Sequence, residues 1–270
     1  ISGRAAQKAG LVGAATARMP AFMGMRGEAK VDSLTIGNIR VRNLVVMIFD
    51  HHFCPPSEEG ALVLQENRAF ARRHGINLFD CGSGNTHHVG VRNGFIRPGT
   101  VVVGSDSHTP IHGTLGCFAT GIGNDSHAGT VMPFGKAWFK VPDTIQVRLA
   151  GTHKTGVTPR DAALWLTATI GEGGAIYKAL EFAGPYVEQL DFWNRWLFPM
   201  ITVDVGAKCG YIEPDEKTLA FVRSVTDKPF EAVQGDPDRK FEATWEWEVG
   251  ALEHLALLGR LLGGLVEAGV

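Results

Sequence analysis

Three short apolar runs, rich in β-branched residues, each end directly in a cluster of polar residues, and this repeated pattern constrains the fold more than any other feature. Runs of this length and composition are typical of buried strands. The three runs are residues 43–49, 76–79 and 100–103. The polar clusters that follow them are Asp50-His51-His52, residues 81–88 and residues 104–110. The sequence therefore places polar groups at the carboxyl ends of successive strands.

Helices are expected between these strands. Ser57 precedes two acidic residues that favour a helix start, and Gly75 follows a basic turn that favours a helix stop. A fourth strand at 144–149 is followed by a capping box at 158–161, which predicts another helix. Strands that alternate with helices indicate a three-layer α/β/α domain. Because ligands bind beyond the carboxyl ends of strands in such domains, we expect the polar clusters to face one crevice.

Composition excludes several classes of function. The chain has 270 residues and a formal net charge of -2, so it lacks the basic field that binding to a phosphate backbone requires. No run of eighteen apolar residues and no secretory signal is present, so we expect a cytoplasmic protein without nucleic-acid or membrane partners.

The first residue is Ile, which suggests a trimmed or partial product. The expected divisions are an N-terminal arm at 1–28, an α/β/α region at 29–230 and an atypical tail at 231–270.

The four cysteines are widely separated in the sequence. They are Cys54, Cys81, Cys117 and Cys209. None belongs to a Cys-x-x-Cys motif, so neither a zinc site nor a redox pair is indicated. We expect reduced and mostly buried thiols.

Eight of the ten histidines lie between positions 51 and 127, and all of these except His74 are within or close after a strand-end loop. Carboxylates near these histidines could hold the imidazole tautomer and raise its basicity. One compatible chemistry is acid–base work on a hydroxy acid, with Ser83 and Ser107 holding its carboxylates. The other is a metal-dependent hydrolase, with ligands from Asp106-x-His108-x-x-x-His112 and from Asp50-His51-His52.

The Asp-His-His triplet at 50–52 also resembles the signature of the DHH phosphoesterases. That family has an Asp-x-Asp strand end upstream and a Gly-Gly-Gly-His motif further on. Neither motif is present in this sequence, which argues against a DHH-type hydrolase. It is kept only as an alternative, on the triplet alone.

A longer run carries a more specific resemblance. Residues 101–125, VVVGSDSHTPIHGTLGCFATGIGND, resemble the Asp-Ser-His-Thr segment of the aconitase and 3-isopropylmalate dehydratase superfamily. The DH at 50–51 and GSGNTH at 82–87 match the two preceding motifs of the superfamily, in order and in approximate spacing. The match continues with residues 135–151, 156–161, 180–184 and 205–218. The resemblance covers roughly residues 43–225.

The resemblance implies a hydro-lyase that acts on a hydroxy di- or tricarboxylic acid such as 3-isopropylmalate, homoaconitate or citrate. It also implies a [4Fe-4S] cluster that acts as a Lewis acid. Carried over to this sequence, it implies that Asp50 orients His51, Asp106 pairs with His87, and His108 pairs with Asp204. Ser107 and Ser83 are implied to bind substrate. The run at 135–145 is closer to the isopropylmalate and homoaconitate branch, which implies a small swivelling partner subunit.

The sequence departs from the superfamily at two places. The cluster ligands of the superfamily are one cysteine and then a Cys-x-x-Cys pair, and these metal-ligating cysteines are not present. Met200 and Ile201 stand where an Asn-Met pair is usual, and Asp204 replaces a Glu. The chain is thus expected to be part of a dehydratase whose cluster ligands lie on another chain or a missing C-terminal segment. The alternatives are an inactive truncated relative, a metal-dependent hydrolase or a binding protein.

Overall fold

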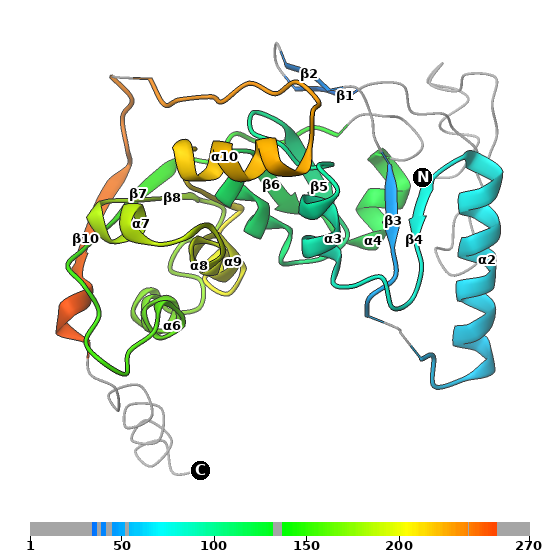
Figure 1. Ribbon diagram of the computed structural model, residues 1–270, viewed down its shortest axis with the longest axis horizontal. Coiled ribbons are helices and arrows are strands. Elements are labelled where there is room, and N and C mark those ends of the chain that lie inside the picture. The colour runs from blue at the N-terminus through cyan, green and yellow to red at the C-terminus, as the bar shows by residue number, and fades with distance from the viewer. Residues whose placement is uncertain are drawn as a thin grey trace. The chain divides into compact units, whose positions relative to one another are not determined.

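The computed structural model describes residues 34–36, 39–41, 45–51, 54–131, 137–236 and 238–252. The chain divides into two compact units, and Figure 1 shows their elements. Unit 1 takes residues up to 95 together with 103–106 and 122–140, and unit 2 takes the remaining residues. The arm expected at 1–28 and the end of the tail, from 253 onward, lie outside the described residues.

The described residues of unit 1 form two small sheets. Its strands are β1 (Leu34–Ile36), β2 (Ile39–Val41), β3 (Val46–Ile48) and β4 (Asn77–Phe79). β1 and β2 are antiparallel, whereas β3 and β4 run parallel, with Met47 opposite Leu78. Its helical segments are α2 (Glu58–His74), α3 (Thr86–Arg92), α4 (Gly123–Ser126) and η3 (His127–Val131). Parallel pairing places the carboxyl ends of β3 and β4 side by side, which brings two of the polar clusters together.

Helix α2 follows its expected signals closely. The Ser57 hydroxyl accepts a hydrogen bond from the Gly60 N–H, and Gly75 adopts a left-handed conformation with φ of 62° at the other end. Acidic residues occupy the first turn and basic residues the last turn, as the helix dipole favours. The helix joins β3 to β4, and in Figure 1 it lies beside β4. A well-capped helix therefore makes the crossover connection that parallel pairing of these two strands requires.

Unit 2 is built on a four-stranded parallel sheet in the order β10-β7-β8-β9. These strands are β7 (Thr144–Ala150), β8 (Ala179–Ala183), β9 (Cys209–Tyr211) and β10 (Ala243–Glu248). Strand β10 was not expected from the sequence, and it lies in the segment that we assigned to the tail. Its register places Trp245 opposite Val147. A further pair consists of β5 (Val101–Gly104) and β6 (Phe118–Gly121).

The helices of unit 2 cover the sheet and close its core. They are α6 (Pro159–Ile170), α7 (Pro185–Gln189), α8 (Phe192–Arg195), α9 (Leu197–Met200) and α10 (Glu216–Val225), with the short turns η2 (Thr109–Leu115), η4 (Ile201–Val203) and η5 (Val249–Ala251). The expected capping box is present at the start of α6, where Thr158 and Asp161 bond reciprocally. Val147, Leu180 and Phe198 are completely buried in the core. Burial of such apolar side chains is the main stabilising term of this unit.

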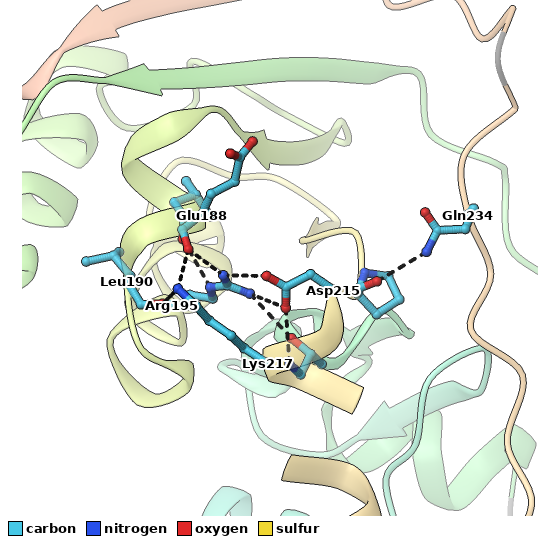
Figure 2. Close-up of polar contacts among 9 residues, drawn as sticks. Glu188, Leu190, Arg195, Asp215, Lys217 and Gln234 are labelled. Atoms are coloured by element: carbon cyan, nitrogen blue, oxygen red, sulfur yellow. Dashed lines mark hydrogen bonds and ion pairs between the residues drawn. The ribbon is translucent and has the colours of Figure 1, made fainter. Parts of the chain in front are cut away.

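A buried arginine ties the helical segments of unit 2 together (Figure 2). Arg195 at the end of α8 is 1% exposed, and its guanidinium pairs with both carboxylate oxygens of Asp215 at 2.7 Å. It also donates to the carbonyls of Val187 and Glu188, both at 3.0 Å. Lys217 donates to the same Glu188 carbonyl. These contacts satisfy carbonyls of the short helix α7 and join it to the start of α10.

The α/β class expected from the sequence is confirmed by parallel strands joined through helices. The four expected strands occur at β3, β4, β5 and β7, each within a few residues of its expected bounds. Within the described ranges, no helix combines the length and the apolar character needed to cross a membrane.

Candidate active site

Asp50 and His51 come directly after β3 and form the first pair of the site. The Nδ1 atom of His51 lies 2.6 Å from Asp50 Oδ1, as the expected orienting role of Asp50 requires. The other oxygen of Asp50 accepts a hydrogen bond of 2.7 Å from the backbone N–H of Thr86. Partial burial opposes ionisation of Asp50, but the hydrogen bonds from Thr86 and His51 hold its pKa below the usual value. Asp50 is therefore a charged anchor between β3 and the start of α3.

Asp106 joins this pair to a second histidine. Its Oδ2 atom lies 3.1 Å from His51 Nε2, and its Oδ1 atom lies 3.2 Å from His87 Nε2. The contact with His87 was expected, whereas the contact with His51 was not. Asp106 and His87 are largely buried, while the His51 side chain is 66% exposed. The result is a continuous chain of contacts in the order Asp50, His51, Asp106, His87, with His51 as its member most open to solvent.

Two carboxylates raise the pKa of His51. The hydrogen bond from its ring to Asp50 is the largest cause, and the charges of Asp50 and Asp106 add to it, against a smaller opposing effect of burial. Because the pKa in the folded state is above that in the unfolded state, this pairing stabilises the fold at pH values below the unfolded pKa. That stabilisation is lost as the pH rises through the folded pKa. The geometry thus favours the imidazolium form of His51 up to a higher pH than in a free histidine.

Substitution of Asp50 by Asn is expected to lower the pKa of His51 more than substitution of Asp106 by Asn, because Asp50 makes the shorter contact and is the larger cause of the shift. The pKa of each variant is read from the titration of the His51 ring protons in NMR spectra. Asp125→Asn changes an exposed acid of the same unit and serves as the control. Equal shifts for Asp50→Asn and Asp125→Asn would contradict the expected pairing.

Helix α3 positions His87, and its first residues were expected to be loop. Asn85 is the N-cap of this helix, and its side-chain oxygen accepts a hydrogen bond of 3.0 Å from the His87 N–H. The preceding loop turns sharply at Gly82 and Gly84, whose φ angles are 89° and 119°. An open hollow of about 400 Å³ lies beside this loop, lined by Phe49, Asp50, His51, Gly82, Gly84 and Asn85.

Ser83 belongs to the same loop, and its expected role in substrate binding stays a prediction. Its hydroxyl donates to the Asp80 carbonyl at 2.6 Å. The Asp80 carboxylate pairs with Arg68 through contacts of 2.7 and 2.8 Å, and this guanidinium lowers the pKa of Asp80 to about 2. Sequence reasoning did not find this pair, because Arg68 lies within α2 and no local pattern relates it to the end of β4.

The remaining expected site residues belong to unit 2. Ser107 Oγ lies 3.2 Å from His108 Nδ1, immediately before η2. Asp204 is exposed and ends the short turn η4. The expected pairing of His108 with Asp204 stays a prediction, as does the contact of Ser107 with a substrate carboxylate.

The cysteines of this chain do not fit an iron–sulfur cluster. Cys117 and Cys209 are buried in unit 2, and burial raises the pKa of both thiols, that of Cys209 to about 12. Such thiols resist the ionisation that cluster ligation requires. Cys54 is exposed and Cys81 is half-buried, and both belong to unit 1. Across the described residues, no three His, Cys, Asp or Glu side chains converge in a group that could hold a metal ion.

Comparison with known proteins places these observations in a family. The sequence profile of the Aconitase family (aconitate hydratase) matches residues 19–254. This match extends beyond the region 43–225 in which the resemblance was visible, and it includes β10.

Several curated relatives are named as large subunits of dehydratases. The chain is 39% identical over 210 residues to 3-isopropylmalate dehydratase large subunit 1 of Methanopyrus kandleri, covering 77% of this chain and 50% of that protein. It is 39% identical over 233 residues to a probable 3-isopropylmalate dehydratase large subunit of Methanothermobacter thermautotrophicus, covering 85% and 55%. A probable methanogen homoaconitase large subunit of the same organism is 38% identical over 211 residues, covering 77% and 49%. The chain therefore spans about half the length of these relatives.

Proposed function

Because the chain belongs to the aconitase family, we propose that it supplies acid–base groups to a hydro-lyase that acts on a hydroxy di- or tricarboxylic acid. One observation carries this proposal. His51 is held between the carboxylates of Asp50 and Asp106, and Asp106 also contacts His87. Dehydration of a hydroxy acid requires a proton for the departing hydroxyl group, and an imidazolium beside an open hollow can donate one.

The proposed role of each residue follows from its contacts. Both ring nitrogens of His51 face carboxylate oxygens, so its protonated form has an acceptor for each of its two donors. Donation to the departing hydroxyl group uses Nε2, whose contact with Asp106 is the longer of the two, and the substrate oxygen then replaces Asp106 as the partner of this N–H. Asp50 orients the ring through Nδ1, and its own position is set by the Thr86 N–H. After each turnover, His87 that has taken up a proton from solvent can pass it through the Asp106 carboxylate to His51, because both contacts are within hydrogen-bonding distance. His51 is thus the proposed proton donor, with the other three residues as its support.

The proposed substrates and partners come from the relatives. Their names mention 3-isopropylmalate dehydratase and homoaconitase, so we propose an acid of this type for this chain. Their description as large subunits supports a separate small subunit as partner. We keep Ser83 and Ser107 as proposed ligands of substrate carboxylates, and His108 with Asp204 as a proposed second acid–base pair. Because the cysteines present do not fit a cluster, no reaction step of this chain is assigned to one.

The test combines binding with complementation. The chain alone is titrated with 3-isopropylmalate by calorimetry, and saturable binding is expected. It is then mixed anaerobically with the half of the Methanopyrus kandleri large subunit that it does not cover and with a small subunit, and the unsaturated product is followed by its ultraviolet absorbance. We expect turnover in the mixture and none with the chain alone.

Binding without turnover in any mixture would favour an inactive relative that retains the ligand site. Absence of binding to 3-isopropylmalate, homoaconitate and citrate would overturn the proposal. Zinc-dependent phosphoester hydrolysis by the chain alone would support the DHH-type alternative instead.

A further inference from the structure

Asn85 occupies a place in the hollow that its capping role does not explain completely. It is exposed, it lines the hollow together with His51, and it is not part of the contact chain from Asp50 to His87. Its side-chain amide has one acceptor and one donor group, and only the acceptor is needed at a helix N-cap. The donor group is therefore available for a second purpose.

The orientation of this amide follows from its contacts. Of the two polar atoms of a side-chain amide only the oxygen accepts hydrogen bonds, so the 3.0 Å hydrogen bond that the His87 N–H donates assigns Oδ1 to the helix side. The planar amide then turns Nδ2 away from the helix start. Among the contacts that the structure gives for the described residues, none joins Nδ2 of Asn85 to a protein acceptor. An amide donor with a fixed direction thus adjoins the hollow beside His51.

We propose that Asn85 is a specificity residue, whose Nδ2 group donates a hydrogen bond to a carboxylate of the substrate bound in the hollow next to His51. This inference rests on the proposed function, because it assumes an anionic hydroxy acid as ligand. The carboxylates at the site, Asp50 and Asp106, already contact imidazole rings, so a ligand carboxylate can approach the exposed side of His51. A neutral amide recognises a carboxylate there without adding a competing charge.

Two substitutions test the donor role of the Asn85 amide while the N-cap of α3 is retained. Asn85→Ser retains a good N-cap and replaces the amide donor by a hydroxyl on a shorter side chain, which reaches less far into the hollow. Asn85→Asp also retains a cap but places a carboxylate where the donor was, which repels an anionic ligand. Asn93→Ser is the matched control, because Asn93 caps the other end of α3 through its own side-chain amide and does not line the hollow.

Binding of 3-isopropylmalate and of its dimethyl ester to the full chain is measured by calorimetry. We expect Asn85→Ser to weaken binding of the acid about tenfold, as the loss of one hydrogen bond to a charged group predicts, with no change for the ester. Asn85→Asp should weaken binding of the acid further, and Asn93→Ser should leave it unchanged. The side-chain amide signal of Asn85 in NMR spectra of the unmodified chain should shift on addition of the acid, which gives a result that does not depend on any variant.

Failure of this proposal is distinct from failure of the proposed function. If the unmodified chain binds the acid while Asn85→Ser binds it equally well and the amide signal does not move, Asn85 has no such role and the proposed function stands. If the unmodified chain binds none of the acids, both proposals are overturned.

Discussion

Replacement of Arg195 by Met is expected to lower the free energy of unfolding of unit 2 by about 3 kcal/mol, the lower end of the range for breaking a buried ion pair. The guanidinium is 1% exposed, and it satisfies the Asp215 carboxylate together with the carbonyls of Val187 and Glu188. Methionine fills a similar volume but donates no hydrogen bond. The carbonyls of α7 would then lose their partners inside the protein, which costs more than the contact itself contributes.

Thermal unfolding followed by tryptophan fluorescence measures this effect, since Trp193 and Trp196 lie next to Arg195 in sequence. The midpoint should fall by roughly 6–12 °C for a unit of this size. The matched control is Arg223→Met, because Arg223 pairs with Glu216 through side chains that are both exposed. A solvent-exposed pair contributes little, so the control midpoint should not move. A similar fall for both variants would show that the Arg195 network does not stabilise the unit as we infer.

Local signals in the sequence were sufficient for the best-capped elements. Helix α2 begins and ends where Ser57 and Gly75 indicated, because a side-chain cap and a left-handed glycine act on neighbouring residues only. Strand β10 was missed, although its last four residues, 245–248, alternate tryptophan and glutamate and this period is typical of a half-buried strand. The polar residues at 234–240, which precede this strand, indicated a surface loop. Its partner β7 is far away in the sequence, so no local pattern could reveal the pairing.

The site was predictable only in part, for the same reason. Strand-end positions indicated that Asp50, His51, His87 and Asp106 could carry chemistry, and the family resemblance indicated the pairs. The bridge from Asp106 to His51 was not expected, because it depends on how the ends of β3 and β5 are placed in three dimensions. Helix α3 was also missed, since it has only two turns and its capping residue, Asn85, was read as part of a glycine-rich loop.

Asp106→Asn is expected to produce a large loss of activity. Asp106 contacts both histidines, so the substitution removes the charge that links His51 to His87 while it preserves the size of the side chain. A misplaced or uncharged partner of a general acid costs roughly a hundred- to ten-thousand-fold in rate, and we expect a loss in this range for the complemented enzyme described above. The measurement is the ultraviolet absorbance of the unsaturated product formed from 3-isopropylmalate.

A second readout distinguishes loss of the charge from loss of the fold. The pKa of His51 should fall in Asp106→Asn, because the charge of Asp106 contributes to its elevation. Asp106→Glu keeps the charge on a longer side chain and should retain more activity than the amide. Glu66→Gln removes an exposed carboxylate on α2 of the same unit and should change neither the rate nor this pKa. Full activity of Asp106→Asn, with the His51 pKa lowered, would mean that proton transfer does not pass along this chain of contacts.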